Sequence, residues 1–137
     1  GQEIGGSRAG VALRDFGRFA QFVMNDGVVD GKRLLPEFWV SDAATMAFKF
    51  SEENLNASPK LRSGGLQGYG YSWWIDGEGA MIANGFAGQR IYINRAEKLI
   101  IVSLSVFPQP GYIGTAEHDH YAEVVRFTDG VRHALSR

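Results

Sequence analysis

The chain has 137 residues, of which 45% are apolar and 21% charged, and this ordinary balance predicts one globular domain over residues 1–137. A formal net charge of −1 without a basic cluster argues against nucleic acid as a partner, and no apolar run reaches the roughly 18 residues that a membrane span needs. The absence of cysteine excludes disulfides and thiolate metal sites, and it leaves the compartment, cytoplasmic or periplasmic, open.

Two helices and a hairpin are expected in the first third of the chain. Residues 11–25 carry apolar side chains at helical spacing, and Gly27 follows as a C-terminal stop because glycine takes a left-handed conformation without strain. Asp30-Gly31 between apolar pairs predicts a hairpin turn. Pro36 then opens a second helix, expected to run to about Ala47, since the missing N–H costs nothing at a helix start.

The rest of the chain predicts a loop, a sheet and a final helix. Residues 49–67 are polar and favour a long loop of the kind that forms lids or binding loops. Strands are expected at 69–75, 81–94 and 99–106, and the continuous apolar run of the last is typical of a central strand. With a helix over 117–135, this order predicts an α+β fold, an antiparallel meander with flanking helices and an open sheet edge.

Five segments, in order along the chain, carry a family pattern: Gly5-Gly6, Arg14–Phe19, Gly27–Pro36, Tyr69–Trp74 and Gly85–Asn94. Together they resemble the C-terminal part of class C β-lactamase-related serine hydrolases, a branch of the penicillin-binding-protein-like family, nearest the 6-aminohexanoate-dimer hydrolases and related esterases. The resemblance implies an incomplete β-lactamase/transpeptidase-like fold. It also implies a small-molecule amide or ester as substrate of the parent enzyme, with no cofactor.

The resemblance further implies a site of three parts: a Ser-x-x-Lys motif, a Tyr on a loop, and a strand motif that lines the pocket. Only the third part maps onto this chain, as Gly-x-x-Gly-Gln over Gly85–Gln89. By this match the backbone N–H of Phe86 is the candidate oxyanion donor. The candidate substrate-binding residues are Gly85, Ala87, Gly88, Gln89 and Trp73. The alternatives are a glycine-bulged strand at 85–89 and core packing for Trp73.

The nucleophile motif is missing, because none of the nine serines has a lysine three residues later. In the family the serine and tyrosine motifs lie upstream of the segment that matches Gly5-Gly6. We therefore expect a hydrolase fragment that is inactive alone and needs its missing N-terminal half. The alternative is a stand-alone, non-catalytic binding or complementation module that forms a homodimer through the open edge. His118-Asp119-His120 suggests zinc, but a solvated helix start is the favoured interpretation, and no metal site is predicted.

Overall fold

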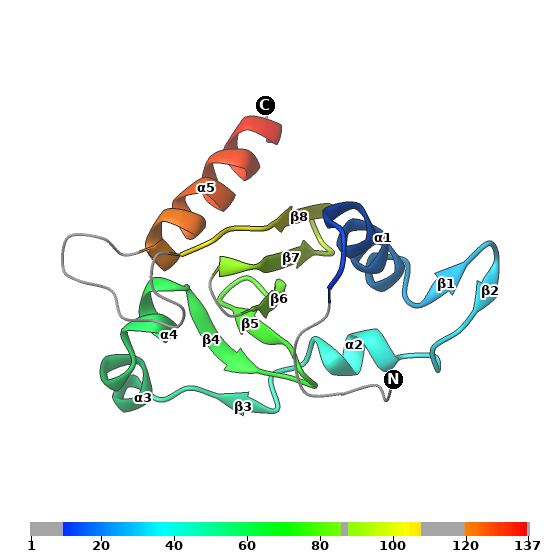
Figure 1. The fold of residues 1–137 in the computed structure, drawn as a ribbon. Helices are drawn as coiled ribbons and strands as arrows, with labels where there is room; N and C mark the ends of the chain where they lie inside the picture. The colour runs from blue at the N-terminus through cyan, green and yellow to red at the C-terminus, as the bar shows by residue number, and fades with distance from the viewer. Residues whose placement is uncertain (1–9, 86–87, 108–119, 137) are drawn as a thin grey trace.

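The computed structural model describes residues 10–85, 88–107 and 120–136 (Figure 1). Within these residues the chain forms a six-stranded antiparallel sheet, a separate two-stranded hairpin and five helices. The strands of the large sheet follow chain order, β3-β4-β5-β6-β7-β8, so every neighbouring pair is connected by a single intervening segment. The predicted α+β class and antiparallel meander are confirmed, although the sheet has more strands than the three expected.

The first third of the chain agrees with the sequence except in the length of its second helix. Helix α1 (Leu13–Met24) and the hairpin of β1 (Val28–Val29) and β2 (Lys32–Arg33) lie where they were predicted. Helix α2 (Trp39–Ala43) starts later than Pro36 and ends before Ala47. Phe38 precedes it with φ +67, which is outside the helical region, and this explains the late start.

The predicted loop over 49–67 is wrong, because short helices and strands occupy most of it. Strand β3 (Phe48–Lys49) precedes helix α3 (Glu52–Ala57), and helix α4 (Pro59–Ser63) leads into strand β4 (Leu66–Tyr69). In α3, Ser51 and Asn54 form a reciprocal capping box, in which each side chain accepts from the other residue's backbone N–H. Local capping therefore stabilises a helix that buries no side chain and so lacks an apolar stripe.

Two of the predicted strands each divide into a hairpin. In place of the strand predicted over 69–75, β4 ends at Tyr69 and β5 (Trp74–Asp76) begins after a turn. A hydrogen bond of 2.8 Å from the Gly70 N–H to the Trp73 carbonyl closes this turn. The second divides into β6 (Met81–Asn84) and β7 (Arg90–Asn94). Gly85–Gln89 is thus the connection between two strands, and not a bulge within one.

Strand β8 (Leu99–Ser103) lies at the edge of the described sheet, so its prediction as a central strand is wrong. Every residue of its neighbour β7 is buried, whereas every residue of β8 is half-buried. Ile100 and Val102 pack against the core on one face of the sheet, and Leu99 and Ile101 pack against the core on the other. The continuous apolar run of β8 therefore indicates that both faces of the strand are covered. It does not indicate that the strand lies in the middle of the sheet.

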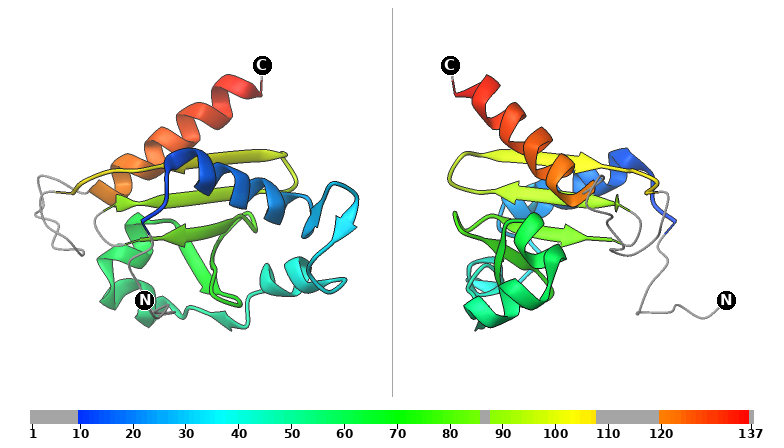
Figure 2. Two further views of the ribbon diagram at one scale, coloured as in Figure 1. Left: turned by 45° about the vertical axis from the view of Figure 1, so that its right-hand side comes forward. Right: turned by 90° about the vertical axis from the view of Figure 1, so that its left-hand side faces the viewer.

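Two hydrophobic cores lie on opposite faces of the sheet. The core under α1 contains Ala20 and Val23 of the helix together with Ile91 and Ile93 of β7. The other core contains Tyr92. Helix α5 (His120–Leu135) crosses that second face and buries Tyr121 and Thr128 (Figure 2). The alternation of side chains along β7 therefore supplies both cores.

Arg132 joins α5 to two turns of the sheet. Its Nε donates to Glu97 Oε2 at 2.9 Å in the β7–β8 turn, and its guanidinium also pairs with Glu78 in the β5–β6 turn. The hydrogen bond from Arg132 lowers the pKa of Glu97 below its usual 4.5. This contact anchors a helix whose own burial is small, because only two of its residues are fully buried.

Replacing Arg132 with glutamine should make the protein less sensitive to acid. Because the folded pKa of Glu97 is lowered, its stabilising contribution is present above about pH 4.5 and is lost as the pH falls through the folded pKa. The variant lacks that contribution, so its free energy of unfolding should fall less between about pH 5 and pH 3. Urea titrations across this range measure the slopes, with Arg126→Gln as the control. Parallel curves for wild type and Arg132→Gln would contradict the assignment.

Candidate functional site

The candidate site is built around the connection between β6 and β7. Asn84 and Arg90 face each other as the last cross-strand pair, and the Gly85 N–H donates to the Gln89 carbonyl at 2.7 Å. This bond joins the two ends of the connection. Phe86, the candidate oxyanion donor, and Ala87 lie outside the described residues.

Gly88 of the connection lies in close contact with Phe107, in the segment that follows β8. Its φ is +97, a conformation that glycine adopts without strain, and a Cβ there would lie 2.5 Å from the Phe107 ring. The Gln89 side chain makes a second contact with this segment, because its Nε2 donates a hydrogen bond to the Ser105 carbonyl at 3.0 Å. A glycine contact and a hydrogen bond therefore attach the connection to residues that follow β8.

A cavity of about 210 Å³ adjoins the connection. It lies between α1 and the ends of β6, β7 and β8, and most of its accessible lining is apolar. Its lining residues are Phe16, Ala83, Asn84, Gly85, Gln89, Arg90, Ile91, Ser103 and Leu104. Of the predicted substrate-binding residues, the structure thus brings Gly85 and Gln89 together at one cavity, with Gly88 beside them.

Trp73 takes a different position. Its ring stacks on Phe19 of α1, with ring centroids 6.3 Å apart and planes inclined by 7°, and it packs against the core under α1. It is not among the residues that line the cavity beside Gly85. The structure therefore places Trp73 in the packing of α1 on the sheet, and not beside the connection.

Arg90 and Asn84 flank the connection and were not singled out as site residues from the sequence; Arg90 shares its face of β7 with Tyr92, opposite the core under α1. Arg90 is 6% exposed, and its Nη1 donates to Asn84 Oδ1 at 3.0 Å. Burial lowers the pKa of the Arg90 guanidinium, and the charge of Asp76 opposes this shift. Within the described residues, Arg90 Nε and Asn84 Nδ2 are buried without a hydrogen-bond partner. Leaving such donors unpaired costs stability.

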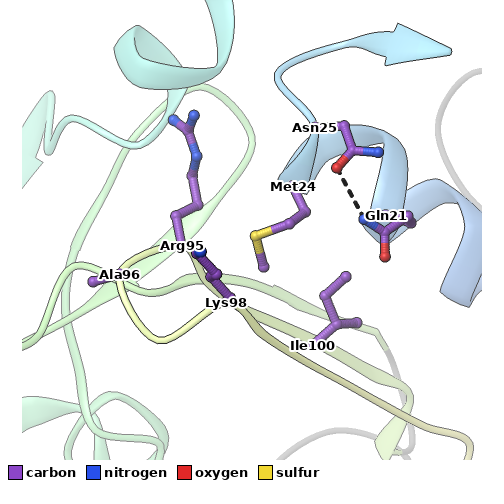
Figure 3. Close-up of a pocket in the computed structure, with 7 residues that line it drawn as sticks. All are labelled: Gln21, Met24, Asn25, Arg95, Ala96, Lys98 and Ile100. Carbon is purple, nitrogen blue, oxygen red and sulfur yellow. Dashed lines mark hydrogen bonds between the residues drawn. The ribbon is translucent and has the colours of Figure 1, made fainter.

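A larger hollow of about 680 Å³ lies at the opposite end of β7, between the end of α1 and the β7–β8 turn (Figure 3). Arg95 and Lys98 of the turn contribute charge, and Met24 and Ile100 contribute apolar surface. On the side of the hollow formed by α1, Gln21 Nε2 donates a hydrogen bond to Asn25 Oδ1 at 2.9 Å. The hollow is open and remote from the 85–89 connection, so it is not part of the candidate site.

The described side chains of the cavity cannot perform nucleophilic catalysis by the family mechanism. Ser103 is the cavity's single described hydroxyl, and the lining includes no lysine or histidine that could take its proton. Across residues 10–85, 88–107 and 120–136, no group of three or more His, Asp or Glu could hold a metal ion. The earlier candidates His118 and Asp119 lie outside the described residues. The described lining can accommodate an apolar group, and the reacting groups would have to come from elsewhere.

No protein-family model matches the sequence, and no curated protein matches it. Among the helices of the described residues, none combines the length and apolar character that a bilayer crossing requires.

Proposed function

We propose that this chain is part of a serine hydrolase of the β-lactamase and penicillin-binding-protein-like family, and that the 85–89 connection forms one wall of its acyl-binding pocket. The observation that carries the proposal is the position of the cavity. It adjoins the sequence segment that resembles the family's pocket-lining motif, and Gly85 and Gln89 of that segment line it. In such an enzyme, fixed backbone N–H groups stabilise the oxyanion that forms as a serine attacks a carbonyl.

The geometry of the connection supports this role. An oxyanion donor must be held in place before the reaction, because a backbone that reorganises during the reaction stabilises less charge. Here the Gly85–Gln89 hydrogen bond and the Gln89–Ser105 hydrogen bond brace the connection on two sides. The mostly apolar cavity beside it suits the acyl part of an amide or ester, and excluding water strengthens any hydrogen bond to the oxyanion.

The proposal assigns the nucleophile to a segment outside these 137 residues. The test is covalent labelling of the protein isolated from its own organism with a biotinylated fluorophosphonate, followed by peptide mass spectrometry. The expected label lies on a serine outside this sequence that is followed by lysine three residues later. A label on any of the nine serines of this chain, or no label at all, would overturn the proposal.

A pair of glutamine variants of that same native protein connects the label to this wall. Gln89→Leu removes the donor to the Ser105 carbonyl, and we expect labelling to slow by roughly tenfold because the wall is no longer held in place. Gln67→Leu is the matched control, since Gln67 lines a hollow on the other face of the sheet. Equal labelling rates in the two variants would exclude the 85–89 connection from the reacting site.

A further inference from the structure

The dipeptide Asn84-Gly85, at the end of β6, carries a chemistry that the proposed function does not use. Of the five asparagines in the sequence, Asn84 is the one that glycine follows. The backbone nitrogen of the residue after an asparagine can attack the side-chain carbon Cγ. Glycine hinders this attack least, because it has no Cβ and its backbone turns freely. Asn84 is therefore the asparagine of this chain that is most open to conversion into aspartate.

The fold restrains both reacting groups. The Gly85 N–H, whose nitrogen is the nucleophile, donates to the Gln89 carbonyl at 2.7 Å. The Asn84 Oδ1, bonded to the carbon that is attacked, accepts from Arg90 Nη1 at 3.0 Å. The reaction therefore needs the end of the β6–β7 hairpin to open. Its rate should follow the fraction of molecules in which that end is open.

Arg90 offers the product of the reaction a partner. It is 6% exposed, and none of the ion pairs formed among the described residues includes it. The charge of Asp76 acts on Arg90 through space, but the Asp76 carboxylate accepts from the backbone N–H groups of Glu78 and Ala80. A carboxylate is a stronger acceptor than an amide for a guanidinium. A carboxylate at position 84 would therefore give Arg90 an ion pair at a contact that already exists.

We propose that Asn84 is a deamidation site, restrained by the β6–β7 hydrogen bonds, and that its aspartyl product pairs with Arg90. The Gly85 nitrogen loses its proton to solvent and bonds to Asn84 Cγ, and the Cγ–Nδ2 bond breaks with release of ammonia. Water then opens the succinimide ring. Attack at Cγ breaks the new bond to nitrogen and yields aspartate, whereas attack at the backbone carbonyl yields isoaspartate.

The position of Arg90 bears on which product forms. A guanidinium that donates to the Cγ oxygen polarises that carbonyl and stabilises the oxyanion formed as water attacks it. The closed hairpin should therefore favour aspartate over isoaspartate. The proposal rests on contacts inside one hairpin, so it depends neither on the hydrolase chemistry nor on an exposed surface.

Timed incubation of the native protein in buffer and in guanidinium chloride, at one pH and temperature, tests the site. Trypsin releases residues 63–90 as one peptide, and chromatography with mass spectrometry separates its asparaginyl, aspartyl and isoaspartyl forms. We expect conversion of Asn84 in both samples, slower in buffer by about tenfold or more and with a larger aspartyl share. Asn56 is the control, because its Oδ1 also accepts from an arginine, Arg62, but alanine follows it. It should stay unconverted.

An Asn84→Asp variant of the same protein tests the partner. Amide hydrogen exchange of β6 and β7 at neutral pH should slow by about tenfold, because a charge-assisted hydrogen bond replaces a neutral one. Asn56→Asp makes the same change beside the exposed Arg62 and should leave this exchange unchanged. Equal conversion rates in buffer and guanidinium chloride would overturn the proposal. So would a folded protein in which Asn84 is never converted, or an Asn84→Asp variant whose exchange is not slowed.

Discussion

Replacing Gly70 with alanine is expected to lower the free energy of unfolding by about 3 kcal/mol or more. A Cβ at this position would lie 2.2 Å from the Ala43 carbonyl oxygen and 2.8 Å from the Thr45 carbonyl oxygen. Both are backbone atoms, so relief requires the end of α2 to move away from the β4–β5 turn. That movement would open the core under α1, to which Ala43 belongs.

Urea unfolding followed by tryptophan fluorescence measures this loss. Gly17→Ala is the matched control, because Gly17 lies inside α1 and a Cβ there meets nothing within 4 Å. That substitution should raise the free energy of unfolding by about 0.5 to 1 kcal/mol, because alanine has a higher helix propensity than glycine. A Gly70→Ala variant as stable as the wild type would show that α2 is not seated on the turn as described.

Replacing Gly88 with alanine is the second large expected effect, a loss of about 2 to 4 kcal/mol. Two costs add at this position. A residue with a Cβ is strained at φ +97, and the new methyl group would lie 2.5 Å from Phe107 Cε1 and 2.7 Å from its Cδ1. The ring would be displaced, and the 85–89 connection would lose its contact with the segment that follows β8.

The Gly79→Ala variant separates the backbone strain at positive φ from the steric clash with Phe107. Gly79 has φ +82 and open space around its Cβ position, so its substitution carries the backbone strain alone, about 1 to 2 kcal/mol. The difference between the two variants in urea unfolding then measures the contact with Phe107. If Gly88→Ala loses no more than Gly79→Ala, the ring does not restrain the connection.

The elements that could be predicted from the sequence are those whose signal is local and strong. The apolar stripe of α1 and the Asp30-Gly31 turn predict their structures within a residue or two. Helices α3 and α4 could not be found this way, because α3 buries no side chain and neither presents a long periodic stripe. The capping residues Ser51 and Asn54 were a signal, but polar composition over the same stretch outweighed it.

The misplaced strands have a common physical cause. Strand boundaries at Gly70 and Gly85 depend on single backbone hydrogen bonds that close turns, and a pattern of apolar residues does not record them. The place of β8 was mistaken because an edge strand covered on both faces has the composition of a central one. Sequence periodicity reports which faces are covered, whereas the order of strands depends on tertiary pairing.

The candidate site was predicted in part. The ordered segments pointed to Gly85–Gln89, and the structure places Gly85 and Gln89 at a cavity. Arg90 and Asn84 were missed because a single arginine in an alternating strand usually faces solvent. Only the pairing of β6 with β7 shows that Arg90 is buried beside the half-buried Asn84. The signal present in the sequence was that Arg90 lies two residues before Tyr92, on the same face of β7.

The chain-order arrangement of the large sheet has a consequence for how the molecule folds. Each of its five pairings joins strands that are consecutive along the chain, and all except β3–β4, whose strands are separated by α3 and α4, close a short loop at little cost in chain entropy. Such a sheet can grow one hairpin at a time. Helix α1 is different, since it begins the described chain and packs on β7 and β8, the last two strands of the sheet. The slow step in folding should then be the arrival of α1 on a sheet that has already formed.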